Sequence, residues 1–201
     1  MKIHNFEQLS DDWFDIRKGK MTASHAQAIA TAGGGLDTYL KNMMAEFYSS
    51  GIKEHFSNKD TDRGNELEPQ ARILYELETG IDVDEVGFIE FDKYTGISPD
   101  GLVKKNGGVE IKCLNDNNHF NMTIEGIKSI ESKYMWQIQM SLYLTKRDWW
   151  DYVGYNPNFE KSLLIYRILP DLEKFKKLEN GIKIGKARIK EIKELYSNIK
   201  I

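Results

Sequence analysis

Two acidic residues and a lysine, Asp100, Glu110 and Lys112, lie close together in segment 98–112, which reads SPDGLVKKNGGVEIK. The Asn-Gly pair at 106–107 stands between two short apolar runs and predicts a β-hairpin turn. In the second strand, the alternation of polar and apolar residues places Glu110 and Lys112 on the same face. Pairing across the hairpin puts Asp100 opposite Glu110, to within about one residue. The predicted face therefore carries two carboxylates beside an ammonium group.

Carboxylate oxygens are the ligands that Mg²⁺ prefers, and this ion combines one or two of them with water and substrate phosphate oxygens. The backbone carbonyl of Ile111 offers a further ligand. A bound cation polarises a phosphoryl group, and Lys112 can orient the attacking water, help to deprotonate it or neutralise charge in the transition state. Alternatively, Glu110 and Lys112 form a solvated ion pair on an edge strand, and Asp100 belongs to a surface turn. The triplet alone does not decide between these interpretations.

The composition is typical of a soluble globular protein, with 40% hydrophobic and 29% charged residues in 201. Cys113 is the only cysteine, which excludes an internal disulfide and a cysteine-ligated zinc site and favours a reducing, cytoplasmic location. No apolar run is long enough to span a membrane. The net charge is −3, but residues 171–201 contain nine Lys and Arg against five Asp and Glu. A nucleic-acid surface must therefore be local.

The hydrophobic pattern predicts an α/β (α+β) fold in which a central mixed β-sheet is flanked by helices. The expected helices cover 7–18, 23–32, 36–48, 62–79, 131–145 and 171–201. The expected strands cover 81–91, 95–103, 108–113, 149–156 and 161–169, and 114–130 is a polar connection without assigned structure. We expect a single domain over 1–201, with N-terminal helices in 1–57, a core that contains the acidic hairpin in 58–170 and a C-terminal helix in 171–201.

Several details of these helices are also predicted. Leu9 should lie on the buried stripe of the first helix, and Thr22 or Ser24 should cap the second. In the helix over 62–79 the buried stripe should include Leu67, Ala71, Leu74 and either Leu77 or Ile73, with the regular part beginning near Glu68 because of Pro69. Two glycines, at 181 and 185, predict a kink or a break in the last helix.

The chain resembles a known nuclease family at several places. SPDGLV followed by GGVEIKC is similar to the PD-(D/E)xK motif of restriction-endonuclease-like enzymes, and the details resemble the lambda-exonuclease/YqaJ-type viral recombination nucleases. Four further stretches fit in the same order: WFDIRKGKMTAS (13–24), RGNELEPQAR (63–72), YMWQIQMSLYLT (134–145) and WWDYVGYNP (149–157). Several motifs in one order are more specific than any one alone.

The resemblance implies roles for individual residues. Asp100, Glu110, Glu68 and the Ile111 carbonyl would hold Mg²⁺, for which Mn²⁺ substitutes, and Lys112 would serve the attacking water. Gln137 matches a glutamine near the catalytic centre. A second set matches positions that contact phosphate, most simply the 5′-phosphate of a DNA end: Arg17, Ser24 and Ser98.

Each of these assignments has a structural alternative. Arg17 could pair with Asp15 or Glu7, and Ser24 could be no more than a helix cap. Glu66 competes with Glu68, although the family position favours Glu68. Gln137 and Gln139 are two residues apart and cannot share a helix face. Leu114 replaces a proline found in many relatives, and the polar residues after it are expected to affect the opening of the site.

The leading functional hypothesis is a Mg²⁺-dependent 5′→3′ exonuclease that degrades duplex DNA from its ends and leaves 3′ single strands for recombination. An endonuclease of the same fold (nicking, restriction-like or junction-cleaving) and a non-catalytic DNA-end-binding module are the alternatives. The family commonly forms a ring-shaped trimer, which the C-terminal helix could support, and a single-strand annealing protein is the expected partner by analogy. If the protein is viral, it would act in the cytoplasm of a bacterial host.

Overall fold

The computed structural model describes residues 1–50 and 59–199, with side chains described for 1–50 and 63–199. Its helices in chain order are α1 (Asp11–Arg17), η1 (Ala23–His25), α2 (Ala26–Thr31), α3 (Gly34–Tyr48), α4 (Lys59–Thr79), α5 (Asp116–Glu125), η2 (Gly126–Ser129), α6 (Ser132–Thr145) and α7 (Leu172–Ser197). None of the helices in these described ranges combines the length and hydropathy required to cross a lipid bilayer.

The strands form two mixed sheets. The first contains β1 (Lys2–His4), β4 (Phe88–Asp92), β5 (Thr95–Ile97) and β2 (Met21–Thr22) in that spatial order, with only the β5–β2 pair parallel. The second contains β3 (Val83–Asp84), β6 (Gly101–Val103), β7 (Gly107–Cys113), β8 (Trp149–Tyr155) and β9 (Leu163–Ile168), with β7 and β8 parallel. The predicted α/β class is confirmed, although the strands divide between two sheets instead of one.

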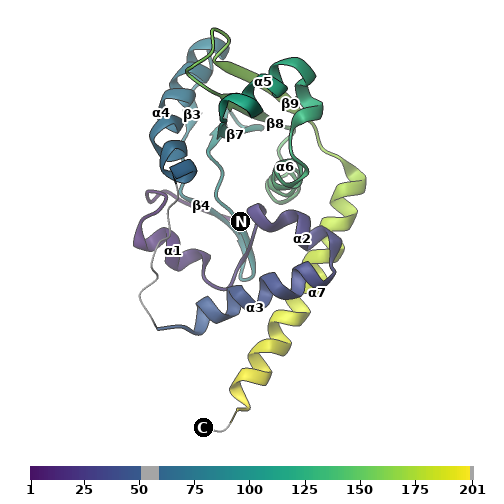
Figure 1. Cartoon of the computed structure of the whole chain (residues 1–201). Helices are drawn as coiled ribbons and strands as arrows, with labels where there is room; N and C mark the ends of the chain where they lie inside the picture. Colours follow the sequence, from purple (N-terminus) through teal and green to yellow (C-terminus); the bar gives the residue numbers. More distant parts are fainter. Residues whose placement is uncertain (51–58, 200–201) are drawn as a thin grey trace.

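Helices cover both faces of the five-stranded sheet (Figure 1). On one face, Ala71 and Tyr75 of α4 pack with apolar residues of β7 and β8, including Val109 and Ile111. The other face belongs to the larger core, which also includes α2, α3, α6 and α7. The alternation in β7 therefore directs its apolar side chains toward α4 and leaves its charged side chains on the opposite face.

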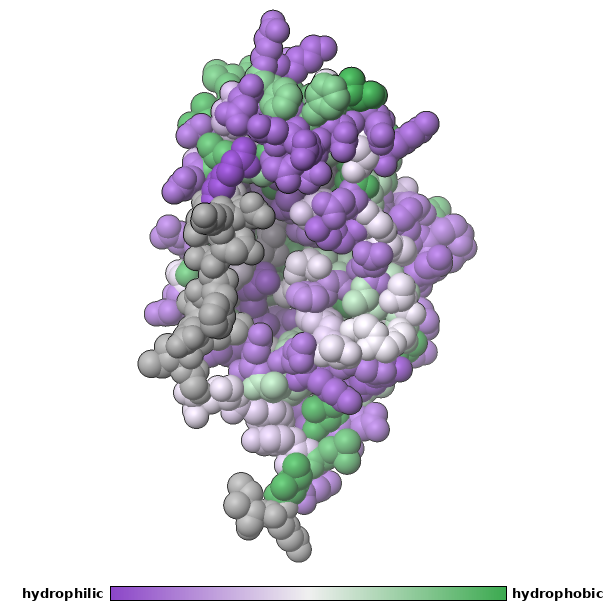
Figure 2. All heavy atoms as spheres, in the orientation of Figure 1, coloured by the Kyte–Doolittle hydropathy of each residue, from purple (hydrophilic) through white to green (hydrophobic). Residues whose placement is uncertain are grey.

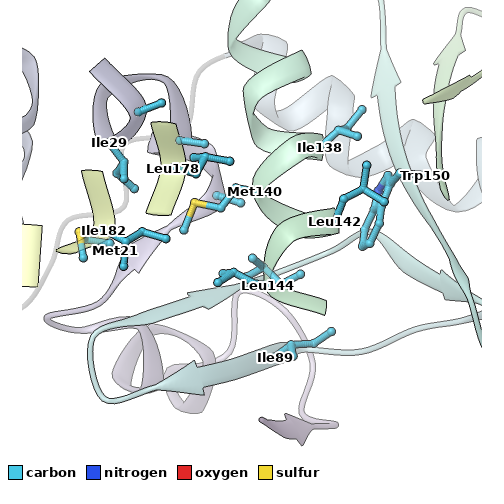
Figure 3. Close-up of a cluster of buried hydrophobic side chains, with 14 of the residues drawn as sticks. Met21, Ile29, Ile89, Ile138, Met140, Leu142, Leu144, Trp150, Leu178 and Ile182 are labelled. Atoms are coloured by element: carbon cyan, nitrogen blue, oxygen red, sulfur yellow. The ribbon is translucent and has the colours of Figure 1, made fainter. Parts of the chain in front are cut away.

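The long helix α7 crosses α2 and α3 without interruption (Figure 1). Figure 3 shows Ile29 of α2 beside Leu178 and Ile182 of α7, with Met140 of α6 near them. The predicted kink or break at the two glycines is wrong, because α7 is one continuous helix from Leu172 to Ser197 (Figure 1). A Cβ at Gly181 would lie 2.6 Å from the Ile29 carbonyl carbon, so glycine is required there for the close approach of α2.

Two predicted strands are wrong as continuous elements. The stretch 81–91 contributes β3 to one sheet and β4 to the other, and 95–103 likewise divides into β5 and β6. The second division falls at Ser98-Pro99-Asp100, because proline cannot donate a ladder hydrogen bond in the middle of a sheet. Because alternating apolar residues continue on both sides of each division, the hydrophobic pattern does not reveal where one strand ends and the next begins. The polar stretch 114–130 forms α5 and η2, with the Asn115 side chain accepting a hydrogen bond from the Asn118 amide at the start of α5.

The helix details also require correction. Leu9 is exposed with a left-handed φ of 67°, and α1 begins only after Ser10, whose hydroxyl accepts from the Trp13 amide. Neither Thr22 nor Ser24 makes a side-chain cap at η1 or α2. The helix α4 already begins at Lys59 and continues through Pro69. Tyr75 of this helix is buried, whereas Ile73 and Leu77, the two residues expected on the buried stripe, are 57% and 75% exposed.

Candidate active site

The predicted hairpin over 98–112 is confirmed. Gly101 pairs with Val109 and Val103 with Gly107, so Asp100 lies at the end of β6 beside the middle of β7. The Asp100 carboxylate accepts a hydrogen bond of 2.7 Å from the Ile111 amide, which fixes its position next to Glu110.

The turn of this hairpin is clamped from outside. The Arg147 guanidinium donates to the backbone carbonyls of Val103, Lys104 and Gly107. The side-chain amide of Asn106 also donates to Asp148 at 2.9 Å. Because Arg147 and Asp148 follow α6 directly, the clamp connects the hairpin to the helix that supplies Gln137.

Glu110 is the centre of the site. Its side chain is 1% exposed, and Oε1 accepts hydrogen bonds from Lys112 Nζ at 2.6 Å and Gln137 Nε2 at 2.5 Å. Oε2 is buried and has no hydrogen-bond partner among the described residues. Lys112 Nζ also lies 3.8 Å from Asp100 Oδ2. Four of the predicted residues therefore meet at one point: Asp100 directly before β6, Glu110 and Lys112 on β7, and Gln137 on α6.

Burial and the proximity of the carboxylates to one another shift the pKa values in this cluster. Burial and, next, the charge of Asp100 raise the pKa of Glu110 to about 8. Burial and Asp100 likewise raise the pKa of Glu68 to about 7. Burial opposes the charge on Lys112, but Glu110 and Asp100 outweigh it and raise the pKa of the ammonium group above its ordinary value. The carboxylates thus repel one another in the absence of a further cation.

Glu68 reaches the same cleft from α4. Arg72, one helical turn later, donates to its Oε1 at 2.9 Å, while Glu66 is exposed on the helix surface. Arg63 at the start of this helix donates to the Cys113 and Leu114 carbonyls at 3.2 and 3.0 Å. The helix that carries Glu68 is therefore tied to the end of the strand that carries Glu110.

These residues fit a hard divalent cation. In the part of the chain with described side chains, no three carboxylate, imidazole or thiol groups form a ready-made cluster for a metal ion. Mg²⁺ does not need one, because it keeps several waters and binds one or two carboxylates plus substrate oxygens. The unpartnered Oε2 of Glu110 and the neighbouring carboxylate of Asp100 supply such ligands.

Of the three residues predicted to contact phosphate, Arg17 and Ser98 lie in direct contact. Arg17 donates to Ser98 Oγ at 2.7 Å, and the indole of Trp13 donates to the same oxygen at 3.0 Å. The guanidinium also stacks 4.0 Å from the centroid of the Trp13 ring. Within the described residues Arg17 forms no ion pair with Asp15, which binds Lys18, or with Glu7. Burial lowers the pKa of Arg17 to about 10, while nearby Tyr39 and Glu46 oppose this shift.

Trp13 and Ser24 line an open cleft of about 1390 Å³ together with Glu68, Ile111, Lys112 and Gln137, whereas Arg17, Ser98, Asp100 and Glu110 are not part of its lining. Asn115–Asn118 line the same cleft, so the polar stretch after Leu114 does border the opening. The face of the molecule in Figure 2 is predominantly hydrophilic. The cleft is thus large and polar enough to receive a charged polymer.

The alternative between the two glutamines is resolved by their contacts. Gln139 donates to the Leu169 carbonyl and accepts from the Asp171 amide, both at 2.9 Å, and so connects β9 to the start of α7. It is a structural residue, whereas Gln137 faces Glu110. Sequence reasoning left His25, Arg63 and Arg147 without a role. His25 directly follows Ser24 and Arg63 opens a quoted motif, so both had a local signal, whereas Arg147 had none.

Comparison with known proteins identifies the family. The model of the YqaJ-like viral recombinase domain matches residues 12–148. The chain belongs to this family. The YqaJ-like assignment confirms the resemblance inferred from the motifs, and it places the Asp100–Glu110–Lys112 cluster inside the matched region.

Solved structures agree with the YqaJ-like assignment. A crystal structure of LHK-Exo in complex with dAMP has a TM-score of 0.83 and 32% identity, covering 92% of this chain and 96% of that one. A structure of LHK-Exo, described as an alkaline exonuclease from Laribacter hongkongensis, has a TM-score of 0.80 and 30% identity, covering 95% of this chain and 100% of that one. A phage-related exonuclease from Haemophilus somnus 129PT shares the fold, with a TM-score of 0.66 and 19% identity over 88% of this chain and 96% of that one.

Among curated proteins, ExoD of Escherichia coli (strain K12) is 34% identical over 50 residues, a quarter of this chain. The match spans 58% of the length of that relative. The family and the structural neighbours together indicate a nuclease.

Proposed function

We propose that this protein is a Mg²⁺-dependent exonuclease that hydrolyses duplex DNA from its 5′ ends in the 5′→3′ direction and leaves 3′ single strands for recombination. The observation that carries the proposal is the proximity of the Arg17–Ser98 pair to the acidic residues of the hairpin. Ser98, held by Arg17 and Trp13, is only two residues from Asp100, which lies beside Glu110. A terminal phosphate at the Arg17–Ser98 pair would place an internal phosphodiester near these acidic residues.

Asp100, Glu110, Glu68 and the Ile111 carbonyl would hold the cation. When bound, Mg²⁺ supplies Lewis-acid polarisation of the phosphoryl group and a nucleophilic hydroxide near neutral pH. The ammonium group of Lys112, 2.6 Å from Glu110, orients the attacking water and neutralises charge that develops on the phosphate. Gln137 holds Glu110 from the helix side, which keeps the carboxylate in one orientation.

Arg17, Ser98 and Ser24 would bind the 5′-phosphate. A guanidinium is always charged and presents several donors, which suits a terminal phosphate. Its stacking on Trp13 and its bond to Ser98 hold it in place before the substrate arrives. Recognition of dAMP, a 5′-mononucleotide, by the similar LHK-Exo supports a nucleotide site in this cleft.

The test uses linear duplexes with a 5′-phosphate or a 5′-hydroxyl, and a closed circular duplex, each incubated with Mg²⁺ or with EDTA. Stepwise loss of the 5′-phosphorylated strand is expected, with no cleavage of the circle. Asp100→Ala and Glu68→Ala should abolish most hydrolysis, while Glu66→Ala, an exposed neighbour on the same helix, should not. Cleavage of the circle would support an endonuclease, and binding without hydrolysis under Mg²⁺ and Mn²⁺ would support an end-binding module.

We also propose that the active form is a homo-oligomer, a trimeric ring by resemblance, that acts in a bacterial cytoplasm with a single-strand annealing protein. The apolar residues Leu178, Ile182 and Ile189 of α7 are buried and pack within the chain. Near the C-terminus, Leu195 and Ile199 are more than half exposed and are available for another subunit, whereas the Tyr196 ring stacks on Tyr48. Light scattering coupled to size-exclusion chromatography would measure the mass, and a monomer at all concentrations would contradict this proposal.

A further inference from the structure

The imidazole of His25 borders the predicted phosphate contacts. It is the last residue of η1 and directly follows Ser24. Its ring stacks on Tyr39 of α3, with centroids 3.9 Å apart and planes 7° from parallel. The Tyr39 hydroxyl in turn accepts a hydrogen bond of 3.0 Å from the Thr22 amide. These contacts hold the imidazole in one orientation beside Ser24.

The hydrogen bonds around Ser24 can run in either direction, because either hydroxyl can donate to the other and His25 Nδ1 donates or accepts according to its tautomer. Ser24 Oγ lies 3.1 Å from Thr22 Oγ1 and 3.2 Å from His25 Nδ1. A serine hydroxyl has one proton to donate and two lone pairs that accept. A phosphate oxygen without a proton can only accept. For Ser24 to donate to phosphate, Thr22 and His25 must therefore both donate to Ser24.

We propose that His25 is a positioning residue of the 5′-phosphate site. By donating its Nδ1–H to Ser24 Oγ, which the neutral imidazole can do, it turns the serine proton toward the terminal phosphate, and the charge of the bound phosphate favours uptake of a proton at the other ring nitrogen, Nε2. The inference rests on the proposed function, which assigns Arg17, Ser24 and Ser98 to the 5′-phosphate.

The charges around His25 decide the direction of this proton linkage. Arg17 on α1 and Glu46 and Tyr39 on α3 act on the imidazole. The helix α2 carries no titratable group, and α6, which also packs against η1, carries Lys133, Tyr134 and Tyr143.

Burial and, next, the charge of Arg17 lower the pKa of His25, with Glu46 opposing, so the imidazole is mainly neutral near pH 7 before the substrate binds. A phosphate dianion beside Arg17 adds an opposite charge and raises that pKa again. Protons are then taken up on binding, and affinity for the phosphate increases as the pH falls through the pKa of the bound state. Each pKa unit of this rise corresponds to a tenfold gain in affinity for the protonated form.

Two substitutions separate hydrogen bonding from titration. His25→Asn keeps a donor near the position of Nδ1 but cannot titrate. His25→Phe keeps the stacking on Tyr39 but has no donor. Arg17→Ala serves as the control for the phosphate site itself. The readout is the ratio of kcat/KM for 5′-phosphoryl over 5′-hydroxyl duplexes between pH 6.5 and 8.5, together with the affinity of each protein for the two duplexes.

For the wild type, the ratio should rise by roughly three- to tenfold from the alkaline to the acidic end of this range. In His25→Asn the ratio should be independent of pH beyond the contribution of the phosphate, whose own second ionisation near pH 6 is the same for every variant. In His25→Phe the ratio should fall by roughly two- to tenfold at every pH, as expected for the loss of one hydrogen bond.

Other outcomes distinguish this inference from the proposed function. If His25→Phe keeps the ratio of the wild type, or His25→Asn keeps its pH dependence, the role of His25 is wrong. If the ratio is close to one in the wild type and unchanged in Arg17→Ala, the 5′-phosphate site itself is wrong. Thermal unfolding checks that each variant is folded, and if His25→Phe is not, the pH dependence of His25→Asn still decides.

Discussion

The close approach of α7 to α2 makes a quantitative prediction for Gly181→Ala. An alanine Cβ at this position would lie 2.6 Å from the Ile29 carbonyl carbon and closer still to its oxygen. The obstacle is backbone on another helix, so no side chain can turn aside, and the two helices must separate. Overpacking of this kind costs about 1–3 kcal/mol or more. The gain in helix propensity from glycine to alanine recovers about 1 kcal/mol.

Gly185→Ala provides the matched control in the same helix. It gains the same propensity, but its Cβ would meet the end of the Met21 side chain, with Cε at 3.1 Å and Sδ nearer. A thioether has several rotatable bonds and adapts to such a change at lower cost. We therefore expect Gly181→Ala to be less stable than Gly185→Ala by about 1–2 kcal/mol.

Chemical denaturation and thermal unfolding measure this difference. For a chain of this size, 1 kcal/mol corresponds to about 2–4 °C in Tm. Because α2 directly follows Ser24 and His25, Gly181→Ala should also weaken discrimination between 5′-phosphoryl and 5′-hydroxyl ends. Equal stability of the two variants, or a Gly181→Ala protein more stable than the wild type, would refute the assignment of this glycine to helix packing.

Three further predictions concern the site and its surroundings. Gln137→Leu should lower hydrolysis by roughly ten- to a hundredfold with little change in Tm, since the Gln137 amide holds the buried carboxylate of Glu110. Gln139→Leu should instead lower the free energy of unfolding in urea by about 1–3 kcal/mol, because two backbone groups before α7 lose their hydrogen-bond partner. Mg²⁺ should raise the Tm of the wild type, by the equivalent of about 2.7 kcal/mol at a hundredfold excess over Kd, and an equal rise in Asp100→Asn would contradict the metal assignment. Burial opposes ionisation of Asp92, but Lys186 and other donors lower the pKa of this carboxyl overall. The ionised Asp92 therefore stabilises the folded state above about pH 4, and this contribution is lost as the pH falls through the lowered pKa. The Tm difference between wild type and Asp92→Asn should shrink between about pH 5 and pH 3.

The hairpin of the candidate site was predictable because its determinants are local. The Asn-Gly turn and the alternation in the second strand give the register to within about one residue and the face of each side chain, and Asp100 lies where they place it. The phosphate cluster is different, since Arg17 and Ser98 are separated by 81 positions and no periodicity relates them. Only the resemblance to a family pointed to both.

The errors share a physical origin in tertiary packing. Gly181 looks like a helix breaker in sequence, but the carbonyl that requires a glycine belongs to α2, more than 150 residues earlier in the chain. The residues 116–125 have poor intrinsic helix propensity, and α5 forms because Asn115 caps it and Met122 is buried. In the same way, burial of Tyr75 rather than Leu77 follows from its hydrogen bond to Asp151 on β8, which α4 covers.

The division between the two sheets at Ser98-Pro99-Asp100 has a consequence for the product. Two residues of extended chain span at most about 7 Å, and the Pro99 carbonyl is fixed by a 2.9 Å hydrogen bond from Gln8. Under the proposed roles, Ser98 touches the terminal phosphate and Asp100 holds the metal at the bond to be cut. The short backbone distance between Ser98 and Asp100 then sets the distance between the terminal phosphate and the bond that is cut, and so the length of the fragment released at each step.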